Sequence, residues 1–223
     1  MLNAADLQAL WLSLKLAAAS TAVLLVLAVP LAWHLAYGRG RWRAGLEAVL
    51  ALPLVLPPTV LGFYLLLALG PQGPGGALAA LWGGRSLAFS FTGLLIGSVV
   101  YSLPFAVQPL CDGFRALGRA PLEAAAVLGA GPLDRVFSVA LPGARDSLLT
   151  AAALSFAHTL GEFGVVLMIG GNIPGETRVV SIAVYEHVEA LDWGAAHRLS
   201  AVLLVLSFLL LWLVYRRRPR PAA

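Results

Sequence analysis

Residues 123–142 read EAAAVLGAGPLDRVFSVALP, a stretch rich in small residues that separates two long apolar runs. Gly129 and Gly131 permit the left-handed turn that ends a helix. Pro132 is suited to begin the next helix because its ring presets the first helical turn. Leu141-Pro142 is expected to close that second helix before the following apolar run. The stretch therefore predicts two short helices joined by a glycine turn.

The first short helix has a favourable start. Pro121 fits its first turn, where the missing N–H costs nothing. Glu123 then lies near the positive end of the helix, where it is available to a cation on a partner. The alanines at 124–126 are too small to hold a partner's backbone away. The segment is suited either to docking against another protein or to resting on lipid headgroups as a helical hairpin.

The composition of the chain is that of a membrane protein. Of the 223 residues, 60% are hydrophobic and 12% are charged, whereas soluble domains average about 25% charged residues. The single cysteine, Cys111, excludes an internal disulfide, and no Cys/His cluster predicts a metal site. Asp6 precedes the first cation, Lys15, which is a poor match to a cleaved signal peptide. We therefore expect the first apolar run to be retained.

Five apolar runs are long enough to cross about 30 Å of hydrocarbon as helices. They cover residues 9–36, 46–69, 87–111, 144–170 and 196–215. The sequence thus predicts an all-α, polytopic helical bundle occupying residues 9–215. Prolines interrupt several runs, which hints at a bundle around a pathway but is also common in membrane helices. These prolines are Pro30, Pro53, Pro57, Pro58 and Pro104.

Cations gather in alternate loops and predict the orientation of the bundle. One set of loops holds Arg39, Arg41, Arg43, Arg115, Arg119, Arg135, Arg145, Arg216, Arg217, Arg218 and Arg220; the opposite set holds Arg85, Arg178 and Arg198. Positive charge favours the cytoplasmic side, so we expect the N-terminus outside and the C-terminus inside. Residues 112–142 become the longest cytoplasmic loop, and 216–223 a basic cytoplasmic tail. Because each cluster adjoins a membrane helix, we expect no nucleic-acid partner.

The fourth run carries a polar face. Ser155, His158, Thr159 and Glu162 recur at i, i+3, i+4 and i+7, which places them on one side of a helix. A polar face in a membrane helix is expected to point toward the bundle interior or a watery path. The four residues are candidates for a translocation pathway or gate. The alternative is that His158 and Glu162 hydrogen-bond each other or a neighbouring helix.

Polar residues also follow the fourth run on the expected external side. Asn172, Glu176 and Arg178 lie in this loop. Arg178 is a candidate for attracting an anion or meeting a partner protein, with a solvated loop charge as the alternative. Residues 178–191 are amphipathic and too charged to span the membrane, so they predict a short surface helix.

Two other classes of membrane protein fit less well. An intramembrane hydrolase needs a nucleophile with its base, or a metal, and the chain lacks a His-Glu-x-x-His motif. An ion-coupled secondary carrier usually shows inverted repeats, and five helices divide poorly into two equal halves. We therefore expect no catalytic residues.

The opening stretch resembles the EAA loop of permeases of ATP-binding-cassette importers. That motif is Glu-Ala-Ala, three residues, Gly, nine residues, an aliphatic residue, one residue and Leu-Pro. The matching residues are Glu123, Ala124, Ala125, Gly129, Val139, Leu141 and Pro142, with Val139 in place of the usual Ile. The resemblance implies that this loop forms the coupling helix that seats on an ATPase subunit.

Two further stretches resemble permeases for molybdate and tungstate. They are GEFGVVLMIGGNIPGETR at 161–178 and LPLVLPPTVLGFYLL at 52–66. The resemblance implies an importer of these oxyanions in the inner membrane of a prokaryote. Sulfate and thiosulfate permeases share part of the pattern and are the alternative. Direct binding of a dianion by Glu162 is not expected, because like charges repel, so a gate or packing role fits this residue better.

The chain lacks parts that such an importer requires. It has no Gly-x-x-x-x-Gly-Lys-Ser/Thr motif, so no cofactor is expected in this chain, and ATP with Mg²⁺ is expected on a partner. External loops of about 17 and 25 residues are too short for a capture domain. The resemblance implies a cytoplasmic ATPase dimer and an external molybdate- or tungstate-binding protein. Five helices are few to enclose a pathway, so a homodimer within the lipid is expected.

Overall fold

The computed structural model describes residues 3–38 and 40–216, and in these residues the regular structure is entirely helical. The helices are α1 Ala4–Tyr37, α2 Arg43–Val55, α3 Pro58–Leu69, α4 Pro74–Ala80, α5 Phe91–Leu117, α6 Ala120–Val127, α7 Pro132–Asp134, the π-helix η1 Arg135–Ala140, α8 Leu141–Gly143, α9 Arg145–Gly161, α10 Gly164–Gly170, α11 Val180–Glu189 and α12 Trp193–Arg216. Apart from Arg216, the predicted basic tail lies outside the described residues, as does Arg39. The all-α class is confirmed.

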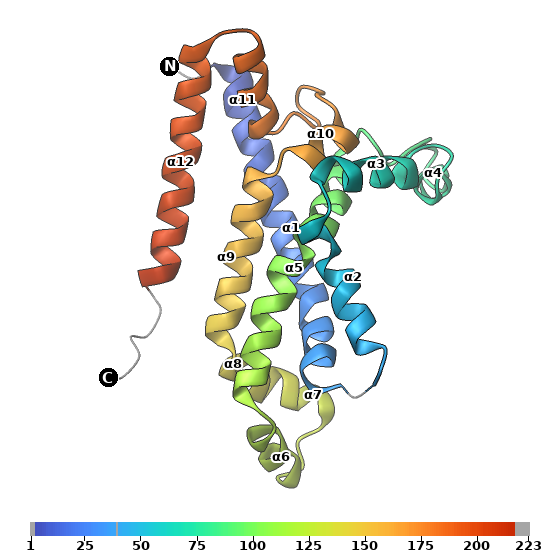
Figure 1. Ribbon diagram of the computed structural model, residues 1–223, viewed down its shortest axis with the longest axis vertical. Coiled ribbons are helices and arrows are strands. Elements are labelled where there is room, and N and C mark those ends of the chain that lie inside the picture. Colours follow the sequence, from blue (N-terminus) through green and yellow to red (C-terminus); the bar gives the residue numbers. More distant parts are fainter. Residues whose placement is uncertain (1–2, 39, 217–223) are drawn as a thin grey trace.

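Three of the five predicted spans coincide with single helices. Helices α1, α5 and α12 are each long and apolar enough to cross a membrane. All three run roughly along the long axis of the molecule, α1 beside α5 and α12 at the edge next to α9 and α11 (Figure 1). With 34 residues, α1 is about 50 Å long and reaches beyond the hydrocarbon. Asp6 in its first turn is buried, and its carboxylate pairs with His187 on α11 at 2.9 Å.

The other two predicted spans are not continuous helices. Helices α2 and α3 meet at an angle of 111°, and α9 and α10 at 60°. The first break falls at Leu56, because Pro57 disfavours a helical conformation of the residue before it. The second falls at Glu162, whose backbone is extended. If each bent pair is counted as one broken span, the described residues contain up to five membrane spans, as predicted.

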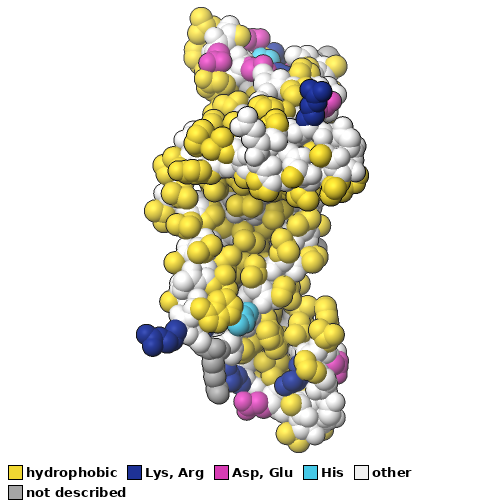
Figure 2. Space-filling view, turned by 90° about the vertical axis from the view of Figure 1, so that its right-hand side faces the viewer, with side chains coloured by type: hydrophobic (Ala, Val, Ile, Leu, Met, Phe, Trp, Pro, Cys, Tyr) yellow, Lys and Arg dark blue, Asp and Glu magenta, His cyan; other side chains and the backbone are white. Residues whose placement is uncertain are grey.

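The core of the bundle is formed by α1, α5 and α9. Leu24 and Ala28 of α1 and Leu110 and Phe114 of α5 belong to one hydrophobic cluster and have almost no exposed surface. Helix α2 lies beside α5, where Arg115 pairs with Glu47 at 2.6 Å. By contrast, α12 is buried over only 11% of its apolar segment. The apolar side chains that remain exposed form a broad band between two charged ends (Figure 2), as expected for a surface in lipid.

Helix α3 leaves the bundle axis and lies against α10, with α4 beyond it at the side (Figure 1). This close approach depends on two glycines. A Cβ on Gly62 would come within 2.7 Å of the Met168 Cβ, and one on Gly164 within 2.7 Å of the Pro58 Cβ. The two broken pairs therefore meet near their break points.

The loop between α5 and α9 forms a lobe at one end of the bundle. It contains α6, α7, η1 and α8, and we call residues 118–144 the coupling lobe. Gly129 has a φ of +89°, which confirms the predicted left-handed turn. The same prediction is wrong for Gly131, whose φ is −67°. The second segment runs through α7, η1 and α8 and ends at Gly143, one residue after the predicted closure at Leu141-Pro142 and before α9 begins.

Candidate functional site

Two of the predicted polar-face residues meet on a side chain of α5. The Ser102 hydroxyl lies 2.9 Å from His158 Nδ1 and 3.1 Å from Thr159 Oγ1. Ser102 and Thr159 are buried, and His158 is partly buried. Ser155 is fully buried, and its hydroxyl has no hydrogen-bond partner among the described residues. The polar face therefore turns toward α5, and it joins the two helices within the bundle.

Glu162 lies at the break between α9 and α10 rather than on the helix. Its backbone carbonyl accepts a hydrogen bond from Ser181 on α11 at 2.6 Å. Its side chain is 4% exposed, and neither carboxylate oxygen has a hydrogen-bond partner among the described residues. The alternative of helix-helix contact is borne out for His158, which pairs with Ser102 on the neighbouring α5 and not with Glu162. Glu162 is left as an unsatisfied polar group beside a cavity.

The cavity has a volume of about 600 Å³ and lies where the two broken pairs meet. Pro58 and Thr59 line it from the start of α3, and Tyr101 lines it from α5. The remaining wall comes from the end of α9 and the start of α10, namely Ala157, His158, Gly161, Glu162, Phe163, Gly164, Leu167 and Met168. Both helix breaks therefore contribute backbone and side chains to one hollow.

The cavity has few polar groups and no cationic side chain in its lining. Its polar groups are the Thr59 and Tyr101 hydroxyls, the His158 ring and the Glu162 carboxyl, and no Lys or Arg lines it. Hydroxyl and imidazole groups are able both to donate and to accept hydrogen bonds. Among the described residues, no group of three or more His, Cys, Asp or Glu is arranged to hold a metal.

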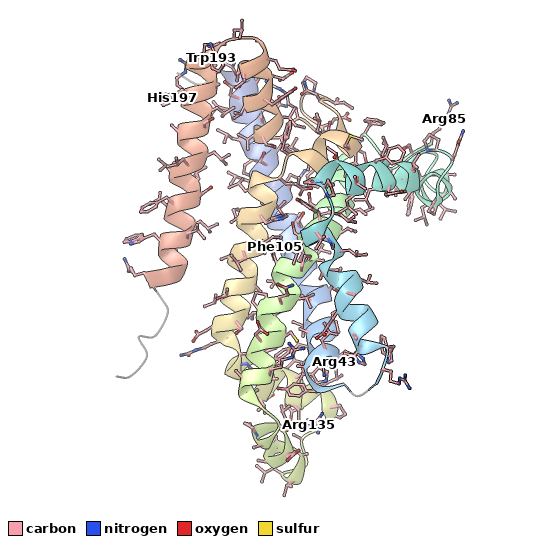
Figure 3. The ribbon with its side chains drawn as sticks, viewed as in Figure 1. Arg43, Arg85, Phe105, Arg135, Trp193 and His197 are labelled. Atoms are coloured by element: carbon pink, nitrogen blue, oxygen red, sulfur yellow. The ribbon has the colours of Figure 1, made fainter. Side chains whose placement is uncertain are left out.

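The sequence analysis missed the face of α5 that completes this cluster. The His158 ring stacks on Phe105, with ring centroids 3.9 Å apart, and also packs against Tyr101 at 4.8 Å. Figure 3 shows Phe105 at mid-height in the bundle, where α5 passes α9. Ser98, Tyr101, Ser102 and Phe105 recur at i, i+3, i+4 and i+7. The same helical period that identified the face on α9 was present here.

The coupling lobe presents part of its motif to solvent. Glu123, in the first turn of α6, and Ala124 are exposed, and Ala125 is half-buried. Val127 and Leu128 at the end of α6 are both 88% exposed. Val139 and Leu141 are half-buried and pack on the core, while Gly129 and Pro142 are exposed. The seven residues thus divide into an outward surface on α6 and an attachment to the bundle on the second segment.

The lobe is fixed to the ends of α1 and α5. The Tyr37 hydroxyl donates to the Phe114 carbonyl oxygen at 2.6 Å and lies 3.2 Å from the Gly118 carbonyl oxygen. Arg119 donates back to the Tyr37 carbonyl oxygen at 2.7 Å. Leu122 is 7% exposed and seats α6 on the core. These contacts tie the lobe to the ends of both long helices.

The predicted external loop is a structured cap rather than a set of free charges. Arg178 donates to Glu186 on α11 at 2.6 Å, and Asn172 donates to the same carboxylate. The Arg178 side chain is 13% exposed, so the alternative of a solvated loop charge is wrong. Thr177 is fully buried and donates to the Gly170 carbonyl oxygen at 2.7 Å. Glu176 remains exposed.

Sequence comparisons place this architecture among known transport proteins. Residues 12–222 match the family described as the binding-protein-dependent transport system inner membrane component. The molybdenum transport system permease protein ModB of Azotobacter vinelandii is 54% identical over 96% of this chain and 94% of its own length. ModB of Escherichia coli K12 is 34% identical over 96% of this chain and 95% of its own length. The sulfate transport system permease protein CysT of Salmonella typhimurium is 34% identical over 82% of this chain and 65% of its own length.

Solved structures share the fold at low sequence identity. A bacterial ABC transporter involved in the import of the acidic polysaccharide alginate has a TM-score of 0.77 and 16% identity, over 97% of this chain and 81% of its own. The MetNI methionine ABC transporter in an inward-facing conformation has a TM-score of 0.71 and 17% identity, over 94% of this chain and 93% of its own. These likenesses identify the arrangement of helices as one found in ABC transporters.

Proposed function

Because this chain belongs to the family of binding-protein-dependent transport system inner membrane components, we propose that it is the permease subunit of an ATP-driven importer of molybdate or tungstate. The observation that carries the proposal is the 54% identity with a molybdenum transport permease over almost the full length of both chains. The likeness to the sulfate permease covers less of both chains at lower identity. Molybdate is therefore favoured over sulfate as the cargo.

The coupling lobe is the proposed contact with the ATPase. Its exposed α6 surface, with Glu123 at the positive end of the helix and two exposed apolar side chains at the other, has the features of a docking segment. ATP and Mg²⁺ are bound by that partner in this proposal, and an ATPase dimer receives one lobe from each of two permease copies. The bonds of Tyr37 and Arg119 then carry movement of the lobe into α1 and α5.

The proposed orientation places the coupling lobe in the cytoplasm and the cap around α11 outside. It rests on the distribution of arginines between alternate loops. A separate binding protein delivers the oxyanion to the outer face, near Asn172, Glu176 and Arg178. Residues 9–215 form one transmembrane domain in this arrangement, and its five spans include the two broken pairs.

The proposed pathway runs along the cavity where the broken pairs meet. Of the candidate residues on this face, His158 and Glu162 line the cavity, whereas Ser155 and Thr159 are buried and do not line it. Ser102 links His158 and Thr159 to α5. A single copy leaves this cavity open, and a second copy about a two-fold axis encloses it. Glu162 controls access rather than binding the dianion, since its carboxylate would repel the cargo. Binding and release of ATP favour alternative states of the two-fold assembly, so that the pathway opens in turn to the two sides of the membrane.

Competition for uptake tests the cargo. A strain that lacks its own molybdate permease is complemented with this chain, its ATPase and its binding protein, and uptake of radioactive molybdate is measured. We expect excess tungstate to abolish uptake and excess sulfate to leave most of it, because all three ions are tetrahedral dianions but only tungstate also matches molybdate in size. Equal inhibition by sulfate and tungstate would support the sulfate permease instead.

A further inference from the structure

An apolar groove separates the coupling lobe from the bundle. Its volume is about 810 Å³. Leu25, Val29 and Trp33 line it from α1, while Val136 and Phe137 line it from η1. Figure 2 shows the lower lobe set against the trunk of the molecule, with hydrophobic side chains on both. The groove is unrelated to the proposed pathway cavity, which lies at the helix breaks.

One cation in this groove lacks an anionic partner among the described residues. Arg135 lines the groove from the first residue of η1, and Figure 3 shows it in the lower lobe. Its Nε is buried and donates to no hydrogen-bond acceptor in the part of the chain that the structure describes. None of the ion pairs formed by these residues includes Arg135. A buried guanidinium nitrogen without an acceptor is costly, so an anion at this position would be stabilised.

Aromatic residues at the end of α1 place the groove at the boundary of the hydrocarbon. The ring of His34, which also lines the groove, packs against Trp42 with ring centroids 4.7 Å apart. Trp42 is 60% exposed, and exposed tryptophans are enriched at the level of lipid headgroups. The apolar wall formed by Leu25 and Val29 extends from this level along α1 into the span.

We propose that this groove binds an anionic phospholipid, with its phosphate on Arg135 and an acyl chain along α1. A guanidinium forms paired hydrogen bonds with phosphate oxygens, and the apolar walls of the groove match a hydrocarbon chain. A zwitterionic phospholipid fits the same walls but carries a cation that opposes Arg135. The bound lipid fills the space between α1 and the coupling lobe and supports the position of the lobe. The proposal does not depend on the identity of the cargo.

Photocrosslinking in vesicles tests the site in the complete transporter. The complex is reconstituted with phosphatidylcholine and trace amounts of either phosphatidylglycerol or phosphatidylcholine carrying a photoactivatable acyl chain, and adducts are mapped by mass spectrometry. We expect adducts on residues 25–33 and 136–137, with about a fivefold preference for phosphatidylglycerol, the factor typical of one basic residue near a membrane surface. Arg135→Gln should remove the preference, and Arg135→Lys should keep part of it.

Arg41→Gln is the matched control, because Arg41 is an exposed arginine in the loop that follows α1 and does not line the groove. This variant should keep the preference at residues 25–33. Equal adducts from the two lipids in the unmodified protein would overturn the proposal. An equal loss of the phosphatidylglycerol preference in Arg41→Gln and Arg135→Gln would indicate general attraction of anionic lipid to the basic surface. That result would overturn a specific site at Arg135. An absence of adducts in the groove would show that protein covers it, and would also overturn the proposal.

Discussion

The hydroxyl of Tyr37, in the last turn of α1, donates a hydrogen bond to the carbonyl oxygen of Phe114, in the last turn of α5, at 2.6 Å. The Trp33 ring packs edge-on against Phe114 one turn earlier on α1, with ring centroids 5.8 Å apart. Because α5 leads directly into the coupling lobe, this bond joins two long helices at the point where the lobe begins. It is the contact through which we expect movement of the lobe to reach α1.

Tyr37→Phe should weaken this connection without creating a cavity. Loss of the hydroxyl removes its hydrogen bonding to the Phe114 and Gly118 carbonyl oxygens, which costs about 1 kcal/mol. We expect a lower thermal unfolding temperature of the permease and weaker stimulation of its ATPase by the loaded binding protein. Tyr64→Phe is the control, because Tyr64 is 63% exposed on α3. Equal effects of the two changes would contradict the role given to Tyr37.

Ser102→Ala tests the link between α5 and α9. The change leaves His158 Nδ1 and Thr159 Oγ1 without their shared partner, and unsatisfied buried polar groups cost about 1–3 kcal/mol each. We expect a lower unfolding temperature and slower uptake. The control is Ser20→Ala on α1, because Ser20 is also fully buried but its hydroxyl has no partner among the described residues. This variant should be neutral or slightly stabilising.

The two glycines of the coupling lobe form a natural pair for comparison. A Cβ added to either glycine would meet no neighbouring atom within 4 Å, but Gly129 has a φ of +89° and Gly131 a φ of −67°. Gly129→Val should cost about 1–2 kcal/mol of backbone strain and redirect the second segment. Gly131→Val should be tolerated. We expect only the first change to release the ATPase in a pull-down, and the opposite pattern would contradict the account of the loop.

Sequence patterns predicted the lobe and part of the polar face for physical reasons that are local. The motif spacing identified α6 and the left-handed Gly129, because turn chemistry depends on a few neighbouring residues. The 3.6-residue period placed Ser155, His158 and Thr159 on one side of α9. These features required no knowledge of distant contacts.

The geometry of the breaks in the predicted spans depends on tertiary packing, so it could not be predicted from the sequence. Pro57 signalled an interruption, but the bend of 111° is set by the fit of α3 against α10 through Gly62. No proline marks the second break, where Glu162 ends the helix between two glycines, Gly161 and Gly164. The helical period of α5 places Ser102 on one face with Ser98, Tyr101 and Phe105, but this period does not identify His158 and Thr159 as its partners.

The orientation of the chain in the membrane has a direct test. Single cysteines are placed in a Cys111→Ser background at Val127, in the coupling lobe, and at Leu81, just after α4; these residues are 88% and 75% exposed. In intact spheroplasts, an impermeant maleimide should label Leu81→Cys at once and Val127→Cys only after permeabilisation. Labelling of Val127→Cys from outside would reverse the proposed topology and remove the lobe from the ATPase.

Glu123→Lys tests the docking surface by reversing a charge in the first turn of α6. The side chain is exposed, so folding and membrane insertion should be retained. We expect the variant to lose its ATPase partner in a pull-down and to lose most of its uptake. The control is Glu176→Lys, which reverses an exposed charge on the external loop and should keep the ATPase.

The central claim is that this chain moves an oxyanion by means of ATP hydrolysed on a partner. Its most direct test is uptake of radioactive molybdate into proteoliposomes that hold the purified permease and ATPase, with the binding protein supplied on the opposite face. We predict uptake that requires ATP and the binding protein together and that persists when proton and sodium gradients are collapsed. Uptake that proceeds without ATP and disappears with an ion gradient would contradict the account and identify a secondary carrier.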